Sequence, residues 1–152
     1  MTWQRGSSRI DELLVEGRLE HVGGAAAEGA SLLASAHGLI ASAMRESTSN
    51  PEAAFVLAYD ASRKACAALL AQQGLRTTSA GHHVTTEAVV RAQFGGPFDT
   101  FGNLRRRRSE IEYPRHPGDA VTTAEAADAI DQAQVMLQAA TELIGRLTIY
   151  RA

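Results

Sequence analysis

Hydrophobic residues recur every three or four positions along most of the chain, which is the spacing of one face of an α-helix. The pattern predicts helices at residues 10–22, 25–47, 51–73, 85–94, 98–113 and 122 to the C-terminus. Four of these helices are long and amphipathic, and short connections join them. This organisation predicts an all-α fold, a four- to five-helix up-and-down bundle that forms a single domain over residues 1–152.

Residues that favour helix ends support several of these boundaries. Asn50 is a good N-cap for the third helix, and Gly74 is expected to end it. Thr122 and Glu125 predict a capping box at the start of the last helix. The polar residues 75–83 are expected to form a loop between the third helix and the next.

The first two helices are predicted from weaker signals. Gly23 and Gly24 are expected to end the first helix, and the pattern leaves open whether that helix joins the bundle or covers it. The second helix carries an apolar stripe at three-to-four spacing. Its predicted inward-facing residues are Leu32, Leu33, Ala36, Leu39, Ile40, Ala43 and Met44.

The composition argues against several classes of function. The formal net charge is −2 over 152 residues, so the chain is not a polycation that binds nucleic acid over its whole surface. No stretch of about 18 apolar residues occurs and the N-terminus is polar, which predicts a cytoplasmic protein with no membrane contact. Cys66 falls on an apolar helix face and is expected to be a buried small hydrophobe. The histidines and the cysteine show no metal-ligand spacing, so neither a metal nor a cofactor is expected.

The strongest candidate for a functional site is the segment 104–116, which holds five arginines, two glutamates, a tyrosine and a histidine. At 100° per residue, Arg108 lies in the apolar stripe of its helix, and Glu112 follows one turn later within ion-pair reach. Arg105 is expected near this pair. Tyr113 is expected beside them, and His116 lies just past the helix end.

The other arginines of the segment have different expected positions. Arg106 shares the flank of Tyr113, two turns away, whereas Arg107 is expected to point to solvent together with Glu110. Pro114 breaks the helix. A local basic patch of this kind on a nearly neutral protein can contact phosphate without making the whole surface bind nucleic acid non-specifically.

Three interpretations of this segment stay open. Arg108 and Glu112 form a structural bridge to neighbouring helices, or the arginines bind a phosphate or an RNA backbone, or an arginine acts with a tyrosine or histidine in catalysis. Asp60 and Arg63 of the third helix are expected to reach the arginine helix and to balance its charge. The predicted phosphate-binding residues are Arg105, Arg106, Arg108 and Arg115.

Several features in order resemble the HEPN domains, which are small prokaryotic all-α domains. These features are a Tyr-Asp-x-x-Arg helix (residues 59–63), a loop ending in His82-His83, a short helix ending in Phe94, the arginine-rich helix with its Glu-Tyr-Pro, and an alanine-rich last helix. The resemblance covers roughly residues 51–147. It implies a homodimer that binds RNA in an arginine-rich cleft. It also implies ancestry among metal-independent ribonuclease toxins, which act beside an antitoxin or a nucleotidyltransferase.

Active HEPN domains carry an arginine followed, after four to six residues, by a histidine. Arg108 matches the arginine, but no histidine follows at that spacing, and the sequence resembles the branch with Glu-Tyr in this place. The candidate catalytic residues are therefore Arg108, Tyr113 and His116, with Glu112, Asp60 and Arg63 in support. His82 and His83 are expected to cap or anchor the loop. The alternative is a non-catalytic interaction or nucleotide-binding module that uses this helix as an interface.

Overall fold

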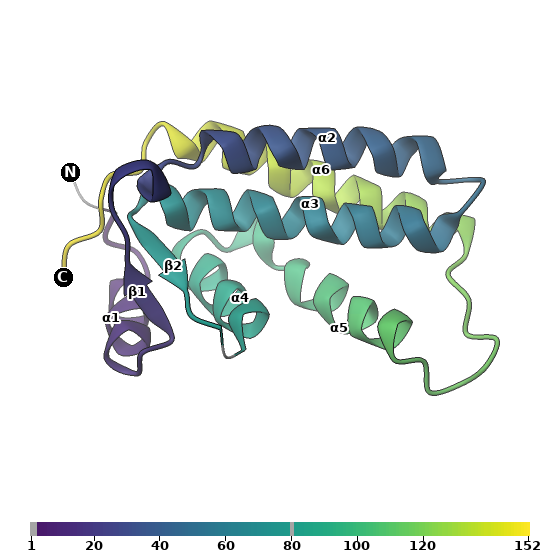
Figure 1. Ribbon diagram of the computed structural model, residues 1–152, viewed down its shortest axis with the longest axis horizontal. Helices are drawn as coiled ribbons and strands as arrows, with labels where there is room; N and C mark the ends of the chain where they lie inside the picture. Colours follow the sequence, from purple (N-terminus) through teal and green to yellow (C-terminus); the bar gives the residue numbers. More distant parts are fainter. Residues whose placement is uncertain (1–2, 80) are drawn as a thin grey trace.

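Three long helices lie side by side in the structure, a computed structural model that describes residues 3–79 and 81–152 (Figure 1). They are α2 (Ala30–Glu46), α3 (Pro51–Gln72) and α6 (Thr123–Ile144), and α3 packs against both of the others. A fourth helix, α5 (Phe101–Glu112), packs against α3. The chain runs along α2, back along α3, out again along α5 and back along α6, which confirms the predicted all-α, up-and-down bundle.

The remaining elements gather at one end of the bundle (Figure 1). They are α1 (Ser7–Val15), β1 (Leu19–His21), η1 (Gly24–Ala27), β2 (Leu75–Thr77), α4 (His82–Gln93) and η2 (Gly96–Phe98). The first helix packs against α4 and β1 and therefore lies at the end of the bundle rather than within it. The hydrophobic pattern had left open whether the first helix joins the bundle or covers it, and the structure shows that it covers one end.

Alanine-rich helix faces bring the bundle helices close together. Ala58, Ala61 and Ala65 of α3 are completely buried, and so is Cys66, as predicted. Gly29, just before α2, lies so close to α3 that a Cβ at this position would overlap the backbone of Ala68. Small side chains at helix contacts permit this approach and favour dense packing.

The predicted helix starts are confirmed at two caps. The Asn50 side chain accepts a hydrogen bond from the amide of Ala53 at 3.2 Å, and the Thr122 hydroxyl accepts one from the amide of Glu125 at 3.0 Å. These bonds satisfy backbone donors that the first turn of a helix leaves free. Both signals are local, so the sequence alone located them.

The prediction of a helix over 10–22 and of a loop over 75–83 was wrong in part. The first helix begins at Ser7 and ends at Val15, and Gly17 then takes a left-handed φ of 73° that turns the chain. Residues 19–21 and 75–77 form two antiparallel strands instead, with Leu19 opposite Thr77. Each strand is only three residues long, too short for an alternating pattern to show, and its partner lies far along the chain.

The other helix bounds also moved. The second α-helix begins at Ala30 rather than at residue 25, and Met44, predicted to face inward, is 54% exposed. The last helix ends at Ile144, and an extended tail follows in which Tyr150 is buried. The hydroxyl of Tyr150 donates to Asp11 at 2.6 Å, so the tail fastens the C-terminal end to α1.

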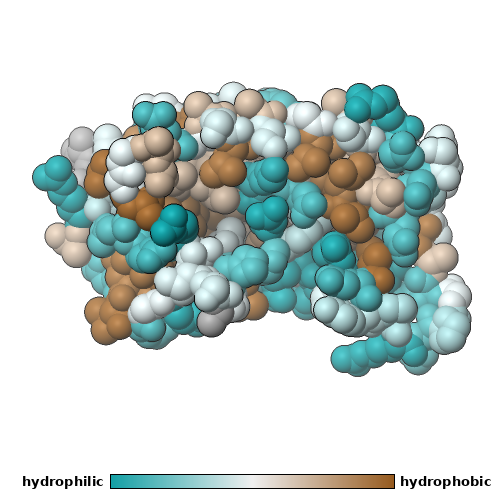
Figure 2. All heavy atoms as spheres, viewed as in Figure 1, coloured by the Kyte–Doolittle hydropathy of each residue, from teal (hydrophilic) through white to brown (hydrophobic). Residues whose placement is uncertain are grey.

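The surface shows no continuous apolar face in the view of Figure 2, where hydrophilic and hydrophobic residues are interspersed. The large hydrophobic side chains that are exposed are Val15, Met44, Val84, Tyr113, Val135 and Ile149. Among residues 3–79 and 81–152, no helix combines the length and the apolar character needed to cross a membrane.

Candidate functional site

Side chains from α3, α4 and α5 converge on a cavity of about 530 Å³ that we call the arginine cleft. It is lined by Tyr59, Asp60, Arg63, His82, His83, Arg105, Arg108, Ser109 and Glu112. The packing of α5 against α3 and α4 creates this cavity, since each helix contributes one wall. Three guanidinium groups and two imidazole rings therefore share one concave surface.

The arginines of the cleft are held by carboxylates. Arg108 donates to Glu112 at 3.1 Å, which confirms the predicted pair, and Arg63 lies 3.7 Å from Asp60. Asp60 and Arg63 share the cavity of Arg108, as the sequence predicted. An arginine has five N–H donors, so a single carboxylate partner leaves others for a ligand.

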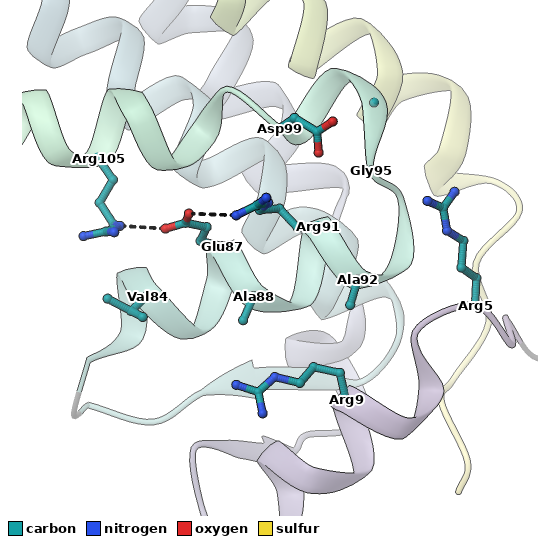
Figure 3. A pocket seen from close by; sticks show the side chains of 11 residues that line it. Arg5, Arg9, Val84, Glu87, Ala88, Arg91, Ala92, Gly95, Asp99 and Arg105 are labelled. Atoms are coloured by element: carbon teal, nitrogen blue, oxygen red, sulfur yellow. Dashed lines mark hydrogen bonds and ion pairs between the residues drawn. The ribbon is translucent and has the colours of Figure 1, made fainter.

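Glu87 of α4 binds Arg105, the third arginine of the cleft. It is buried, and its Oε2 accepts a hydrogen bond from Nε of Arg105 at 2.9 Å, while Arg91 lies 3.6 Å from its Oε1 (Figure 3). Gly102 makes room for this carboxylate, because a Cβ there would overlap Oε1 of Glu87. The bond uses Nε of Arg105 and leaves its terminal nitrogens available.

Two histidines occupy the first turn of α4, beside the arginines. Their ring centroids lie 3.9 Å apart. Nδ1 of His82 lies 3.4 Å from the carbonyl oxygen of Ser79, which favours the proton on Nδ1 and leaves the Nε2 lone pair free. His83 anchors α4 to α3, because its Nδ1 shares a 2.5 Å hydrogen bond with the hydroxyl of Tyr59.

The surroundings of Tyr59 and His83 shift the pKa values of both side chains. Burial raises the pKa of Tyr59 to about 12, so the phenol keeps its proton at neutral pH. Burial lowers the pKa of His83 below its ordinary value of 6.5, and the nearby His82 and Arg63 act in the same direction. His83 is therefore neutral at pH 7, and its Nδ1 can accept the hydrogen bond from the protonated hydroxyl of Tyr59.

We expect this histidine to make the protein less stable in mild acid. Above pH 6.5 both the folded and the unfolded chain hold His83 neutral. As the pH falls below 6.5, the unfolded chain binds the proton first, so the free energy of unfolding decreases. Urea denaturation at pH 7.5 and 5.5 should show a smaller loss in His83→Asn than in the natural protein.

His37 provides a matched control, because it is exposed on α2 and far from the cleft in sequence. His37→Asn should lose as much stability between the two pH values as the natural protein does. An identical loss in His83→Asn and His37→Asn would contradict the pKa shift of His83.

Tyr113 and His116, which the sequence grouped with Arg108, line a neighbouring cavity of about 510 Å³ instead. Arg106 and Arg115 line this second cavity too, and Tyr113 is 71% exposed. Tyr113 follows the last residue of α5, at the start of the loop that leads to α6. The structure thus divides the predicted site residues between two cavities, with Arg105 and Ser109 in the lining of both.

The prediction that Arg107 points to solvent was wrong. Its side chain is 17% exposed and donates to Glu125 at 2.5 Å and to Asp119 at 2.8 Å. These carboxylates raise the pKa of the Arg107 guanidinium above its ordinary value. The network ties α5 to the start of α6, so Arg107 serves the fold rather than a ligand.

Sequence reasoning missed two parts of the cleft. Glu87 was not singled out, because its partner Arg105 lies 18 positions away on another helix. The bond between Tyr59 and His83 spans 24 positions, although both residues were noted in the resemblance to HEPN domains. A polar residue on the inner face of the short helix was the only available hint for Glu87.

The described residues include no group of three or more histidine, cysteine or acidic side chains placed to hold a metal ion. Comparison of the chain with protein-family models, with curated proteins and with solved structures found no match in any of the three.

Proposed function

We propose that this protein binds single-stranded RNA in the arginine cleft and cleaves it without a metal ion. The observation that carries the proposal is the convergence of Arg63, Arg105 and Arg108 with a histidine pair in one cavity. Guanidinium groups bind phosphate through paired, charge-assisted hydrogen bonds. The histidine that the spacing after Arg108 lacks is supplied from α4.

The chemistry needs one group that moves a proton and cations that stabilise the phosphate. Nε2 of His82 accepts the proton of a ribose 2′-hydroxyl, and the 2′-oxygen attacks the adjacent phosphorus. The bond to the 5′-oxygen breaks, and the imidazolium returns the proton to that oxygen. The products are a 2′,3′-cyclic phosphate and a 5′-hydroxyl, and Arg105 and Arg108 stabilise the charge on the non-bridging oxygens.

The resemblance to HEPN domains extends the proposal to a homodimer of the toxin-related type. On this hypothesis the protein acts beside an antitoxin or a nucleotidyltransferase, and the exposed Tyr113 is accessible to modification by such a partner. The alternative interaction module would use the same helix as an interface. Light scattering on the natural protein and Arg108→Gln separates the two, because only an interface role changes the oligomeric state.

Binding is tested by fluorescence anisotropy with a labelled single-stranded RNA. Arg108→Gln is expected to raise Kd about tenfold, because it removes one charge-assisted contact to phosphate. It should also make the slope of log K against log salt concentration shallower by about 0.7, which corresponds to the loss of one phosphate contact on a single strand. Arg63→Gln should act in the same way.

Arg45→Gln is the matched control, because Arg45 is exposed on α2 and donates to Ser42 outside the cleft. It should leave both the Kd and the salt slope unchanged. Equal weakening by Arg45→Gln and Arg108→Gln would show that RNA binds through overall charge, and the cleft would lose its role.

A further inference from the structure

A buried carboxylate lies where α4 meets α5, with three guanidinium groups around it. Glu87 accepts a hydrogen bond from Arg105 at 2.9 Å, and two more arginines lie farther away, Arg91 at 3.6 Å and Arg106 at 3.9 Å. In Figure 3, Arg105 and Arg91 reach Glu87 from opposite sides. Glu87 lines a neighbouring cavity of about 740 Å³ rather than the arginine cleft. Any effect of Glu87 on a ligand in the cleft is therefore exerted through another side chain or through its charge.

Arg105 is the arginine that Glu87 holds most firmly. The Arg105 side chain is 24% exposed, whereas those of Arg91 and Arg106 are 57% and 56% exposed. Water screens ion pairs at exposed positions, so the two outer pairs contribute little. The bond to Arg105 is short, charge-assisted and partly buried, and such bonds are about twice as strong as neutral ones.

The place of Arg105 in the fold makes its orientation important. Arg105 lines the arginine cleft and also both neighbouring cavities, those of about 510 and 740 Å³. A long side chain at such a junction has several rotamers, and a ligand that fixes one of them loses affinity to the entropy cost. The bond from Nε to Glu87 restricts this freedom before a phosphate arrives and leaves the terminal nitrogens as donors.

The surface of α5 leaves space for this carboxylate at one glycine. A Cβ at Gly102 would overlap Oε1 of Glu87. The overlapping atoms belong to the end of a side chain rather than to the backbone, so an added methyl group would displace the carboxylate while the helices stay in place. The bond between Glu87 and Arg105 therefore depends on the absence of a side chain at Gly102.

We propose that Glu87 is a positioning residue that holds Arg105 in the orientation that binds the RNA phosphate, a role that rests on the proposed function of the cleft. Charge alone and positioning predict opposite effects. Removal of a negative charge beside a phosphate site should tighten the binding of an anion by electrostatics alone. Loss of the fixed orientation of Arg105 should weaken that binding instead.

Gly102→Ala tests the positioning without altering any charge. Displacement of the Glu87 carboxylate is expected to raise the Kd of a labelled single-stranded RNA about threefold and to slow its single-turnover cleavage about tenfold, because misplaced groups cost more in the transition state than in the ground state. Glu87→Gln should act in the same direction on both quantities. In the background of Arg105→Gln neither substitution should have a further effect, because no guanidinium is left to position.

Two matched controls separate this role from stability. Glu125→Gln removes a carboxylate that holds Arg107, the arginine of α5 that belongs to the contact with α6 rather than to the cleft. Gly38→Ala adds a methyl group to α2, where the new Cβ would meet open space. Both variants should keep the Kd and the cleavage rate of the natural protein, and circular dichroism should show that all variants fold.

NMR measures the orientation of Arg105 without RNA. The Nε–H of Arg105, assigned by its loss in Arg105→Gln, is expected to exchange slowly with water in the natural protein and faster in Gly102→Ala and Glu87→Gln. If the natural protein does not bind RNA, the proposed function is wrong, and this exchange decides by itself whether Glu87 holds Arg105. Equal exchange in the natural protein and both variants overturns the positioning role, and so does tighter RNA binding by Glu87→Gln.

Discussion

His82→Ala is expected to slow RNA cleavage at least a hundredfold, because it removes the group that accepts the proton of the 2′-hydroxyl. Its binding of RNA should change less than threefold, since the three arginines of the cleft remain. The measurement is the single-turnover cleavage rate of a labelled RNA in the presence of EDTA. An RNA with one 2′-deoxy position should bind normally and resist cleavage at that position.

His116→Ala is the informative control for this experiment. His116 was the histidine favoured by the sequence, but it lines the second cavity rather than the arginine cleft. We therefore expect its cleavage rate to match that of the natural protein. Loss of cleavage in His116→Ala, together with full activity in His82→Ala, would place the reaction in the second cavity. If the natural protein does not cleave RNA, the proposal of an enzyme is wrong.

Gln73→Leu is expected to lower the free energy of unfolding by about 3 kcal/mol and the melting temperature by roughly 9 °C. Gln73 and Gln93 are fully buried and exchange two amide hydrogen bonds, at 2.7 and 2.9 Å. Their backbone carbonyls accept from Tyr150 and Trp3, so the pair joins the ends of α3 and α4 to both chain termini. Removing one amide leaves the other buried without its partners.

A double-mutant cycle with urea denaturation tests this explanation. Gln73→Leu/Gln93→Leu should recover most of the loss and come within about 1 kcal/mol of the natural protein, because no polar group is then left unsatisfied. Gln138→Leu, at an exposed position of α6, should change stability by less than about 0.5 kcal/mol. A double variant as unstable as the sum of its single variants would show that the amide pair is not the cause.

The parts of the fold that the sequence predicted are those that depend on local interactions. Helical periodicity located the four helices of the bundle, and the side chains of Asn50 and Thr122 marked two of their starts within three residues. The pair between Arg108 and Glu112 followed from one turn of helix geometry. The arginine helix could therefore be predicted as a candidate site from local features alone.

The parts that the sequence could not predict depend on contacts between distant segments. Periodicity tells which face of a helix is buried, but it does not tell which residues of two buried faces meet. The burial of Glu87 against Arg105 depends on such a contact, and so does the pairing of Leu19 with Thr77. The short strands could not be recognised without each other.

The sequence by itself determined an all-α bundle with an arginine-rich helix, because hydrophobic spacing and helix caps act within a few residues. Only the tertiary structure decided which arginines share a cavity with histidines. Packing of α4 against α5 brought His82 to Arg108 and left His116 in another cavity. The tertiary structure also decided the contact of Arg107 with Glu125 of α6, since carboxylate partners from another segment stabilise a guanidinium that is only 17% exposed.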